Sequence, residues 1–184
     1  AAQTVSLSAF GWIITLAPLA MIFGFNAVLN KGSMAAAQAM FWAFSVVMGM
    51  SLADIALIYT GDSIARVFLI TAATFGGMSL FGYTTKKDLT GIGSFMYMGL
   101  WGIIIASIVN IFLKSSGLYY AISYIAVLIF TVLTAYDVQT IKAMYYSSDN
   151  EDTVSRKAIA GAMNLYLDFI NLFIYLMRIM GDRK

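Results

Sequence analysis

The sequence predicts an all-α polytopic membrane protein, a compact bundle of transmembrane helices, and three observations support this prediction. Of the 184 residues, 61% are hydrophobic and only 11% are charged, whereas a soluble domain has roughly 25% charged residues. The charges gather in short segments between long apolar runs. Most of these runs contain about 20 residues, the length that a helix needs to cross a hydrocarbon core of about 30 Å. The lipid bilayer is therefore an expected partner.

Six apolar segments follow one another along the chain, each ended by charged or turn-forming residues. The polar stretch 145–157 is the only sizeable connection, and Pro18 is the only proline. This spacing leaves no room for a soluble domain, so we expect residues 1–184 to form a single transmembrane helical domain. The expected spans are residues 9–28, 34–59, 63–83, 92–113, 118–144 and 158–180.

Six spans place both ends of the chain on the same side of the membrane. Basic residues would otherwise indicate the cytoplasmic face, but the two faces carry similar numbers, five and six, and so indicate no orientation. The face of the termini takes Arg66, Lys114, Arg178, Arg183 and Lys184, and the other takes Lys31, Lys86, Lys87, Lys142, Arg156 and Lys157.

The residue types that are missing exclude much of enzyme chemistry. The chain has no cysteine and no histidine, which excludes disulfides, thiolate or imidazole metal sites, cysteine nucleophiles and Ser/His pairs. We expect neither an enzyme nor a tightly bound cofactor, although an aspartyl dyad, which needs only two acids, is one enzymatic alternative. The net charge of +2 is spread over the loops, so a nucleic-acid partner is not expected. The many aromatic and methionine side chains are assigned to lipid-facing and interfacial positions.

Three aspartates lie inside the expected spans and require an explanation. A charged side chain at the centre of a bilayer costs about 2.5 to 3.5 kcal/mol on insertion scales. Asp54 lies within about two helical turns of the end of its span, where its carboxylate reaches interfacial water, so a structural or interfacial role is favoured there. Asp137 and Asp168 flank the polar connection on consecutive spans. An antiparallel hairpin folded at that connection brings these two acids to comparable depth, facing each other.

The last span carries a polar stripe. Asn164, Asp168 and Asn171 are spaced i, i+4 and i+7 and so share one helical face, whereas Leu167, Phe169 and Leu172 are expected to point elsewhere. In one interpretation the stripe holds helices together through hydrogen bonds between Asp168 and the asparagines. In the other it lines a path for ions or protons.

Two carboxylates brought together in a low-dielectric site cannot both ionise easily, so we expect the pair to share a proton near physiological pH. Deprotonated, the same oxygens are hard ligands of the kind that Ca²⁺ prefers, and asparagine carbonyls or water complete its shell. Protonation and cation binding then compete. Asp137 and Asp168 are the candidate pH-sensing, gating and metal-ligating residues, and the candidate supporting or pore-lining polar residues are Asn164, Asn171, Gln139 and Asp54.

Three segments resemble one known family. Segment 133–139 (LTAYDVQ) resembles the aromatic-Asp-Thr-Gln signature of the Bax inhibitor-1 family, also called the transmembrane Bax inhibitor motif family. Segment 164–173 (NLYLDFINLF) resembles the last-helix pattern of that family, and segment 81–89 (FGYTTKKDL) adds a third similarity. The order and spacing of the three segments are similar to those of bacterial members, and the resemblance covers nearly the whole chain.

The resemblance implies a seven-helix fold whose central last helix is wrapped by the others, in a bacterial inner membrane. It also implies a pH-sensitive leak that carries Ca²⁺ as the transported ion, with Asp137 and Asp168 as the sensor pair. An alternative that the resemblance also implies is an interaction protein that regulates a membrane-bound protease or a stress response without conducting ions.

The sequence departs from the family pattern in three places. Val138 stands where the signature has threonine, which leaves Gln139 as the polar neighbour of the acid. Six spans are present rather than seven, so we expect that this chain lacks the family's first helix. Bacterial members are described as closing through an arginine on an early helix, but no arginine precedes Arg66, and Lys31 is the nearest basic residue in the early region.

Overall fold

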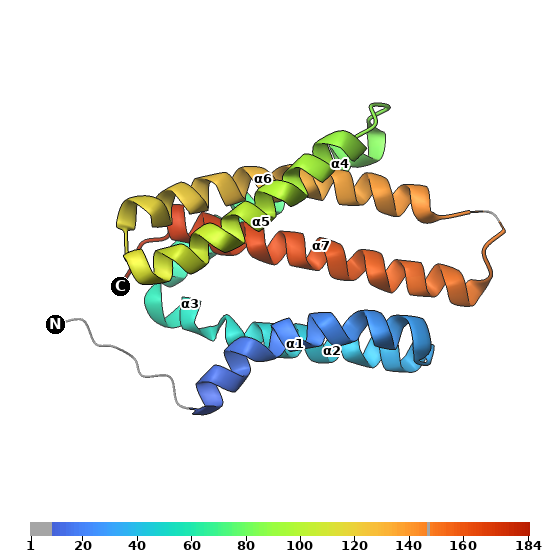
Figure 1. The fold of residues 1–184 in the computed structure, drawn as a ribbon, viewed down its shortest axis with the longest axis horizontal. Coiled ribbons are helices and arrows are strands. Elements are labelled where there is room, and N and C mark those ends of the chain that lie inside the picture. The colour runs from blue at the N-terminus through green and yellow to red at the C-terminus, as the bar shows by residue number, and fades with distance from the viewer. Residues whose placement is uncertain (1–8, 147) are drawn as a thin grey trace.

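The computed structural model describes residues 9–146 and 148–184 and confirms the predicted all-α bundle (Figure 1). In the described part of the chain, the only extended pairing is an isolated bridge between Tyr59 and Arg183. The helices are α1 (Ala9–Lys31), α2 (Met34–Ser51), α3 (Ala53–Ile58), α4 (Gly61–Thr84), α5 (Thr90–Leu113), α6 (Ser116–Met144) and α7 (Glu151–Met180).

The helices agree with the expected spans except at two boundaries. Five segments of the described chain are long and apolar enough to cross a membrane: Met34–Ile58, which combines α2 and α3, and each of α4 to α7. The backbone departs from the helix at Leu52, so the second expected span consists of two helices. The last helix begins at Glu151 rather than at residue 158, because the side chain of Asn150 accepts a hydrogen bond from the Thr153 amide at 2.8 Å and caps it.

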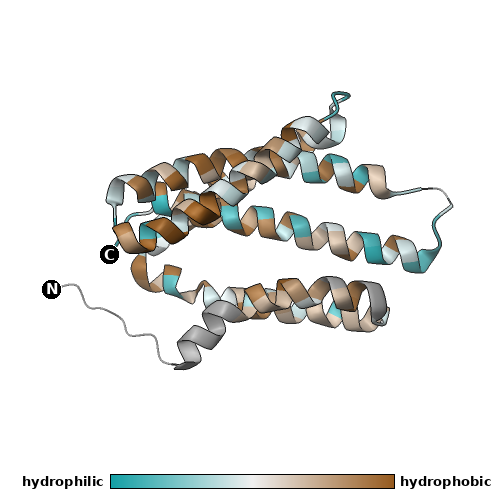
Figure 2. Ribbon diagram, in the orientation of Figure 1, coloured by the Kyte–Doolittle hydropathy of each residue, from teal (hydrophilic) through white to brown (hydrophobic). Residues whose placement is uncertain are grey.

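Hydrophobic residues dominate the middle of the helices, and hydrophilic residues gather at the connections and over the first turns of α7 (Figure 2). Many large apolar side chains point outward, including Phe23, Trp42, Trp101 and Phe112, each at least 68% exposed. In water such a surface would drive association, whereas in a bilayer it meets lipid of the same polarity.

Helix α7 joins two separate apolar clusters. The larger cluster contains residues of α4, α5 and α6 together with Leu172 and Met177 of α7. The smaller one consists of residues of the α1–α2 hairpin packed on Met163 of α7, with Phe44 fully buried. Helix α6 packs against α4, α5 and α7, and α7 also contacts α2 and α4. The last helix is therefore the element that holds the α1–α2 hairpin to the rest of the bundle.

Helices α4 and α6 approach each other closely at a glycine. A Cβ atom placed on Gly82 would lie 2.2 Å from the backbone oxygen of Ala135, so this crossing requires glycine. The contact lies two residues before Asp137 on α6 and fixes the helix that carries this acid. Small residues at such crossings let helix backbones approach where lipid supplies no hydrophobic drive.

Polar contacts fasten the two ends of the bundle. At the end that holds the C-terminus, the Lys184 backbone amide donates to the Ile58 backbone oxygen at 2.9 Å. The Thr60 backbone amide donates to the Asp182 backbone oxygen at 3.0 Å. Arg66 pairs with Asp182 at 2.9 Å on the same face. These contacts tie the end of the chain to the turn between α3 and α4.

At the opposite end, Arg156 of α7 donates hydrogen bonds to the backbone oxygens of Leu29 and Gly32, in the turn between α1 and α2. Lys157 pairs with Asp149 at 2.6 Å, and this hydrogen bond holds the pKa of the Asp149 carboxyl below its usual value. Both basic residues thus stabilise the start of the last helix at the membrane surface.

Replacing Gly82 with alanine tests the close crossing. We expect Gly82→Ala to lower the stability of the folded protein by about 1–3 kcal/mol, the cost of overpacking a filled site, because the Ala135 backbone cannot move aside without shifting α6. Unfolding in detergent, followed by tryptophan fluorescence against denaturant, measures the difference.

The matched control is Gly77→Ala in the same helix, where nothing lies within 4 Å of the added Cβ. We expect this variant to be as stable as the parent protein or slightly more so, since alanine is the better helix former. Equal stabilities for the two variants would contradict the crossing described above.

Candidate functional site

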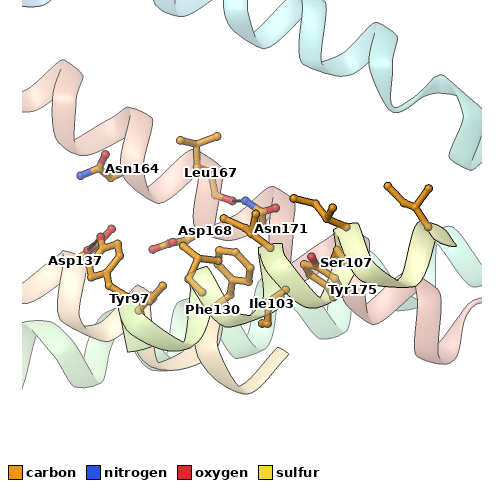
Figure 3. Close-up of a pocket in the computed structure, with 15 residues that line it drawn as sticks. Tyr97, Ile103, Ser107, Phe130, Asp137, Asn164, Leu167, Asp168, Asn171 and Tyr175 are labelled. Atoms are coloured by element: carbon orange, nitrogen blue, oxygen red, sulfur yellow. Dashed lines mark hydrogen bonds between the residues drawn. The ribbon is translucent and has the colours of Figure 1, made fainter. Parts of the chain in front are cut away.

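The structure brings Asp137 and Asp168 together between α6 and α7, as the hairpin argument predicts. Both side chains are buried, with 5% of each residue exposed, and their carboxyl groups lie within hydrogen-bonding reach of each other. The two groups point toward each other in Figure 3. Two carboxylates at this separation in a buried site repel each other strongly, and a proton between them relieves the repulsion.

A third polar group, Tyr97 of α5, completes the contact. Its hydroxyl donates a hydrogen bond to Oδ1 of Asp137 at 3.2 Å, and its ring packs edge-on against Tyr136. Oδ2 of Asp168 is buried and has no hydrogen-bond partner among the described residues. Asp137 therefore accepts a hydrogen bond from another helix, whereas Oδ2 of Asp168 accepts none from the described residues.

Sequence reasoning missed Tyr97, because it assigned the aromatic residues of the spans to lipid-facing positions. Tyr97 is 41% exposed, so part of its ring fits that assignment, but its hydroxyl reaches inward. Gly93, one turn earlier on α5, lies against the Tyr136 ring, with a Cβ there only 2.4 Å from a ring carbon. The signal available in the sequence was the glycine one turn before Tyr97, because a glycine on a membrane helix indicates a close approach to another helix.

The acid pair lies at one end of an elongated pocket of about 560 Å³ between α5, α6 and α7 (Figure 3). Phe130 and Leu133 of α6 contribute to its lining, together with aliphatic residues of α5 and the predicted polar stripe of α7. Helices α5 and α7 both pack on α6 but make few or no direct contacts with each other. The pocket occupies the space that this leaves.

The polar stripe of α7 faces the pocket, but its members do not form the hydrogen bonds expected of a structural contact. Asn164 and Asn171 line the pocket with Asp168, and the Asn171 amide donates to the Leu167 backbone oxygen of its own helix at 2.8 Å. Among the described side chains, neither asparagine is hydrogen-bonded to Asp168. Leu167 also lines the pocket, so its expected outward direction was wrong, because residues three and four apart share a helix face.

Gln139 and Asp54 lie away from the acid pair. Gln139 accepts a hydrogen bond from the Leu89 amide and donates one to the Lys87 oxygen, both at 2.9 Å. It therefore holds the connection between α4 and α5. Asp54 is exposed in the first turn of α3, where the helix dipole favours a negative charge. The interfacial role favoured from the sequence stays a prediction.

A basic partner for the acids is not found among the described side chains: every ion pair there involves other acids, namely Asp149, Asp152 and Asp182. Arg156 of α7 instead donates hydrogen bonds to the turn between α1 and α2. The side chain of Lys31, the early basic residue noted in the sequence, lies outside the described residues. In the described part, no third acid joins the pair to form an acidic cluster of metal-binding size.

Comparisons with known proteins place the chain in one family. The family model described as "Inhibitor of apoptosis-promoting Bax1" matches residues 1–184. An uncharacterized protein of Rickettsia prowazekii is 51% identical over 175 residues, which cover 95% of this chain and 74% of the relative.

Two further relatives are named as membrane proteins. The inner membrane protein YbhL of Escherichia coli is 45% identical over 93% of this chain and 74% of its own length. An uncharacterized membrane protein of Streptococcus pyogenes is 39% identical over 89% of this chain and 70% of its own length. Together with the membrane-spanning helices, these names agree with the expected location in a bacterial inner membrane. The chain is a multi-pass integral membrane protein and belongs to the Bax inhibitor-1 family.

Proposed function

We propose that this protein is a pH-sensitive calcium leak channel, in which Asp137 and Asp168 share a proton and their protonation state controls opening. The observation that carries the proposal is the buried contact between the two carboxyl groups on neighbouring transmembrane helices. Buried acids inside a membrane protein mark ion or proton pathways by default, since their insertion is costly.

The proton-sharing step follows from the environment of the pair. With one proton, the two carboxyl groups form a hydrogen bond and carry a single negative charge. When that proton leaves, two negative charges remain close together in a poorly hydrated site, and their repulsion favours either separation of α6 from α7 or entry of a cation. Each of these outcomes changes the space between the two helices, which supplies a physical link between pH and opening.

The oxygen atoms around the pair suit a hard divalent cation. Ca²⁺ takes six to eight oxygen ligands at about 2.3–2.6 Å. The two carboxylates supply up to four oxygens, and the Asn164 carbonyl of α7 and the Tyr97 hydroxyl of α5 line the same pocket. Water would complete the shell of an ion held this incompletely, which favours passage over tight retention. Calcium is therefore proposed as the transported ion rather than as a resident cofactor.

The first prediction concerns the acid pair itself. Asp137→Asn removes the shared proton while keeping the shape of the side chain, so Ca²⁺ flux into liposomes loaded with a calcium indicator becomes insensitive to pH between 6 and 8. Asp54→Asn is the matched control, because Asp54 is an exposed acid on α3 outside the pocket, and we expect it to keep the parent pH profile. A parent-like profile in Asp137→Asn would reject the proposed sensor.

A second prediction separates the tyrosine from the acids. Tyr97→Phe removes the hydroxyl that donates to Asp137, and a lost donor to a carboxylate destabilises its charged form. The pH at which Ca²⁺ flux is half-maximal therefore rises, whichever protonation state is the open one, and the pH dependence is retained. Tyr124→Phe, an exposed tyrosine on α6, is the control and leaves the midpoint in place. A Tyr97→Phe midpoint at or below that of the parent contradicts the role given to the hydroxyl.

A further inference from the structure

The pocket beside the acid pair is larger and more apolar than a metal ion needs. Its lining runs along α5 from Leu100 to Ile111, a distance of about 16 Å at 1.5 Å per residue. This equals about half of a hydrocarbon core of 30 Å, which is the length of one lipid leaflet. The α5 wall is aliphatic over most of this length and includes Ile104 and Ile108, 41% and 53% exposed.

The uncharged polar residues Ser107, Asn171 and Tyr175 lie further along the pocket, whereas its acidic groups are concentrated at one end. Asp137, Asp168 and Asn164 lie there, with the Asp168 Oδ2 atom buried and without a partner among the described residues. None of the described residues that line the pocket is basic. A ligand that complements this arrangement has a compact positive group with several hydrogen-bond donors at one end and an alkyl chain at the other.

We propose that this pocket binds a cationic amphiphile with a primary amine head, whose ammonium group lies between Asp137 and Asp168 and whose alkyl chain lies along α5. An ammonium group carries three donors and a compact charge, so it can bond to both carboxyl groups and to the Asn164 carbonyl at once. Its nitrogen would supply the partner that the Asp168 Oδ2 atom lacks.

Charge and head-group size select this ligand over other membrane components. An anionic head group would be repelled by the acid pair. A neutral alcohol of equal chain length would gain the apolar contacts but leave the carboxylate charges unbalanced in a buried site. The ligand enters sideways from the bilayer, since α5 and α7 make few or no direct contacts.

Binding of the amine does not require ion conduction. Its consequence does rest on the proposed function: an ammonium group between the carboxylates occupies the positions proposed for Ca²⁺, so the amine acts as a blocker of the leak. Binding and flux are therefore measured separately.

The binding experiment uses the purified protein in lipid nanodiscs without calcium, with dodecylamine as the probe and dodecanol as the uncharged probe of equal chain length. The readout is the thermal unfolding midpoint followed by tryptophan fluorescence. A ligand that binds only the folded state raises this midpoint with concentration. We expect dodecylamine to raise it in a saturable manner and dodecanol to leave it nearly unchanged. Equal shifts with the two probes would overturn the proposal.

Variants locate the two ends of the ligand. The double variant Asp137→Asn with Asp168→Asn removes the counter-charge and lowers the dodecylamine affinity at least tenfold, whereas Asp54→Asn leaves it unchanged. Ile108→Trp fills the aliphatic part of the pocket with the acids intact and also lowers the affinity at least tenfold. Its control is Ile105→Trp on the same helix, where Ile105 is 59% exposed and outside the pocket lining.

The Ile108→Trp pair keeps the test decisive if the double acid variant does not fold. Unchanged affinity in Ile108→Trp places the chain elsewhere and overturns the proposal. In a parallel liposome assay, dodecylamine is expected to inhibit the Ca²⁺ flux of the parent protein at concentrations that saturate the site in nanodiscs. Saturable, acid-dependent binding without any flux in the parent rejects the calcium leak and leaves the amine site standing.

Discussion

The register of α6 against α7 is the constraint on which the site depends. Two contacts fix this register on either side of the acids. Phe130 stacks on Tyr175, with ring centroids 6.0 Å apart. Phe130 lies seven residues before Asp137, and Tyr175 lies seven residues after Asp168. Toward the polar connection, Gly161 lies against the Ile141 side chain. A shift of one residue between these two antiparallel helices would rotate one acid away from the other, so that it would face the lipid or the core instead.

The cost of burying two acids is distributed over several elements. Tyr97 of α5 supplies a donor to one of them, and the crossing of α4 at Gly82 holds the α6 segment that carries Asp137. The buried Oδ2 atom of Asp168 has no hydrogen-bond partner among the described residues, so its desolvation cost is not offset there. The proposed proton sharing, calcium binding and amine binding all involve this acid pair, which is why the three are expected to compete.

The α1–α2 hairpin has a different relation to the site. It packs on the early part of α7 through Met163, Phe44 and their neighbours and is fastened there by the hydrogen bonds of Arg156. Helix α5 lies on the other side and contacts α6. Opening of the space between α6 and α7 would therefore involve α7, which has residues in both apolar clusters, so a change at the acid pair reaches both ends of the bundle.

The sequence by itself determined the membrane class, six apolar segments and the pairing of Asp137 with Asp168, because apolar length and helical periodicity are local properties of the chain. It also identified the family through motifs that lie at the end of α4 and on α6 and α7. Asn164 and Asn171 were placed on the same helical face as Asp168 for the same reason of periodicity.

Only the tertiary structure decided which groups of other helices meet the acids. The approach of Tyr97 depends on the packing of α5 on α6, and the role of Gln139 depends on where the connection between α4 and α5 folds back. The pocket exists because α5 and α7 both pack on α6 without closing on each other. Such contacts between distant segments carry no periodic signal in the sequence, since lipid-facing and inward-facing residues of a membrane helix have similar polarity.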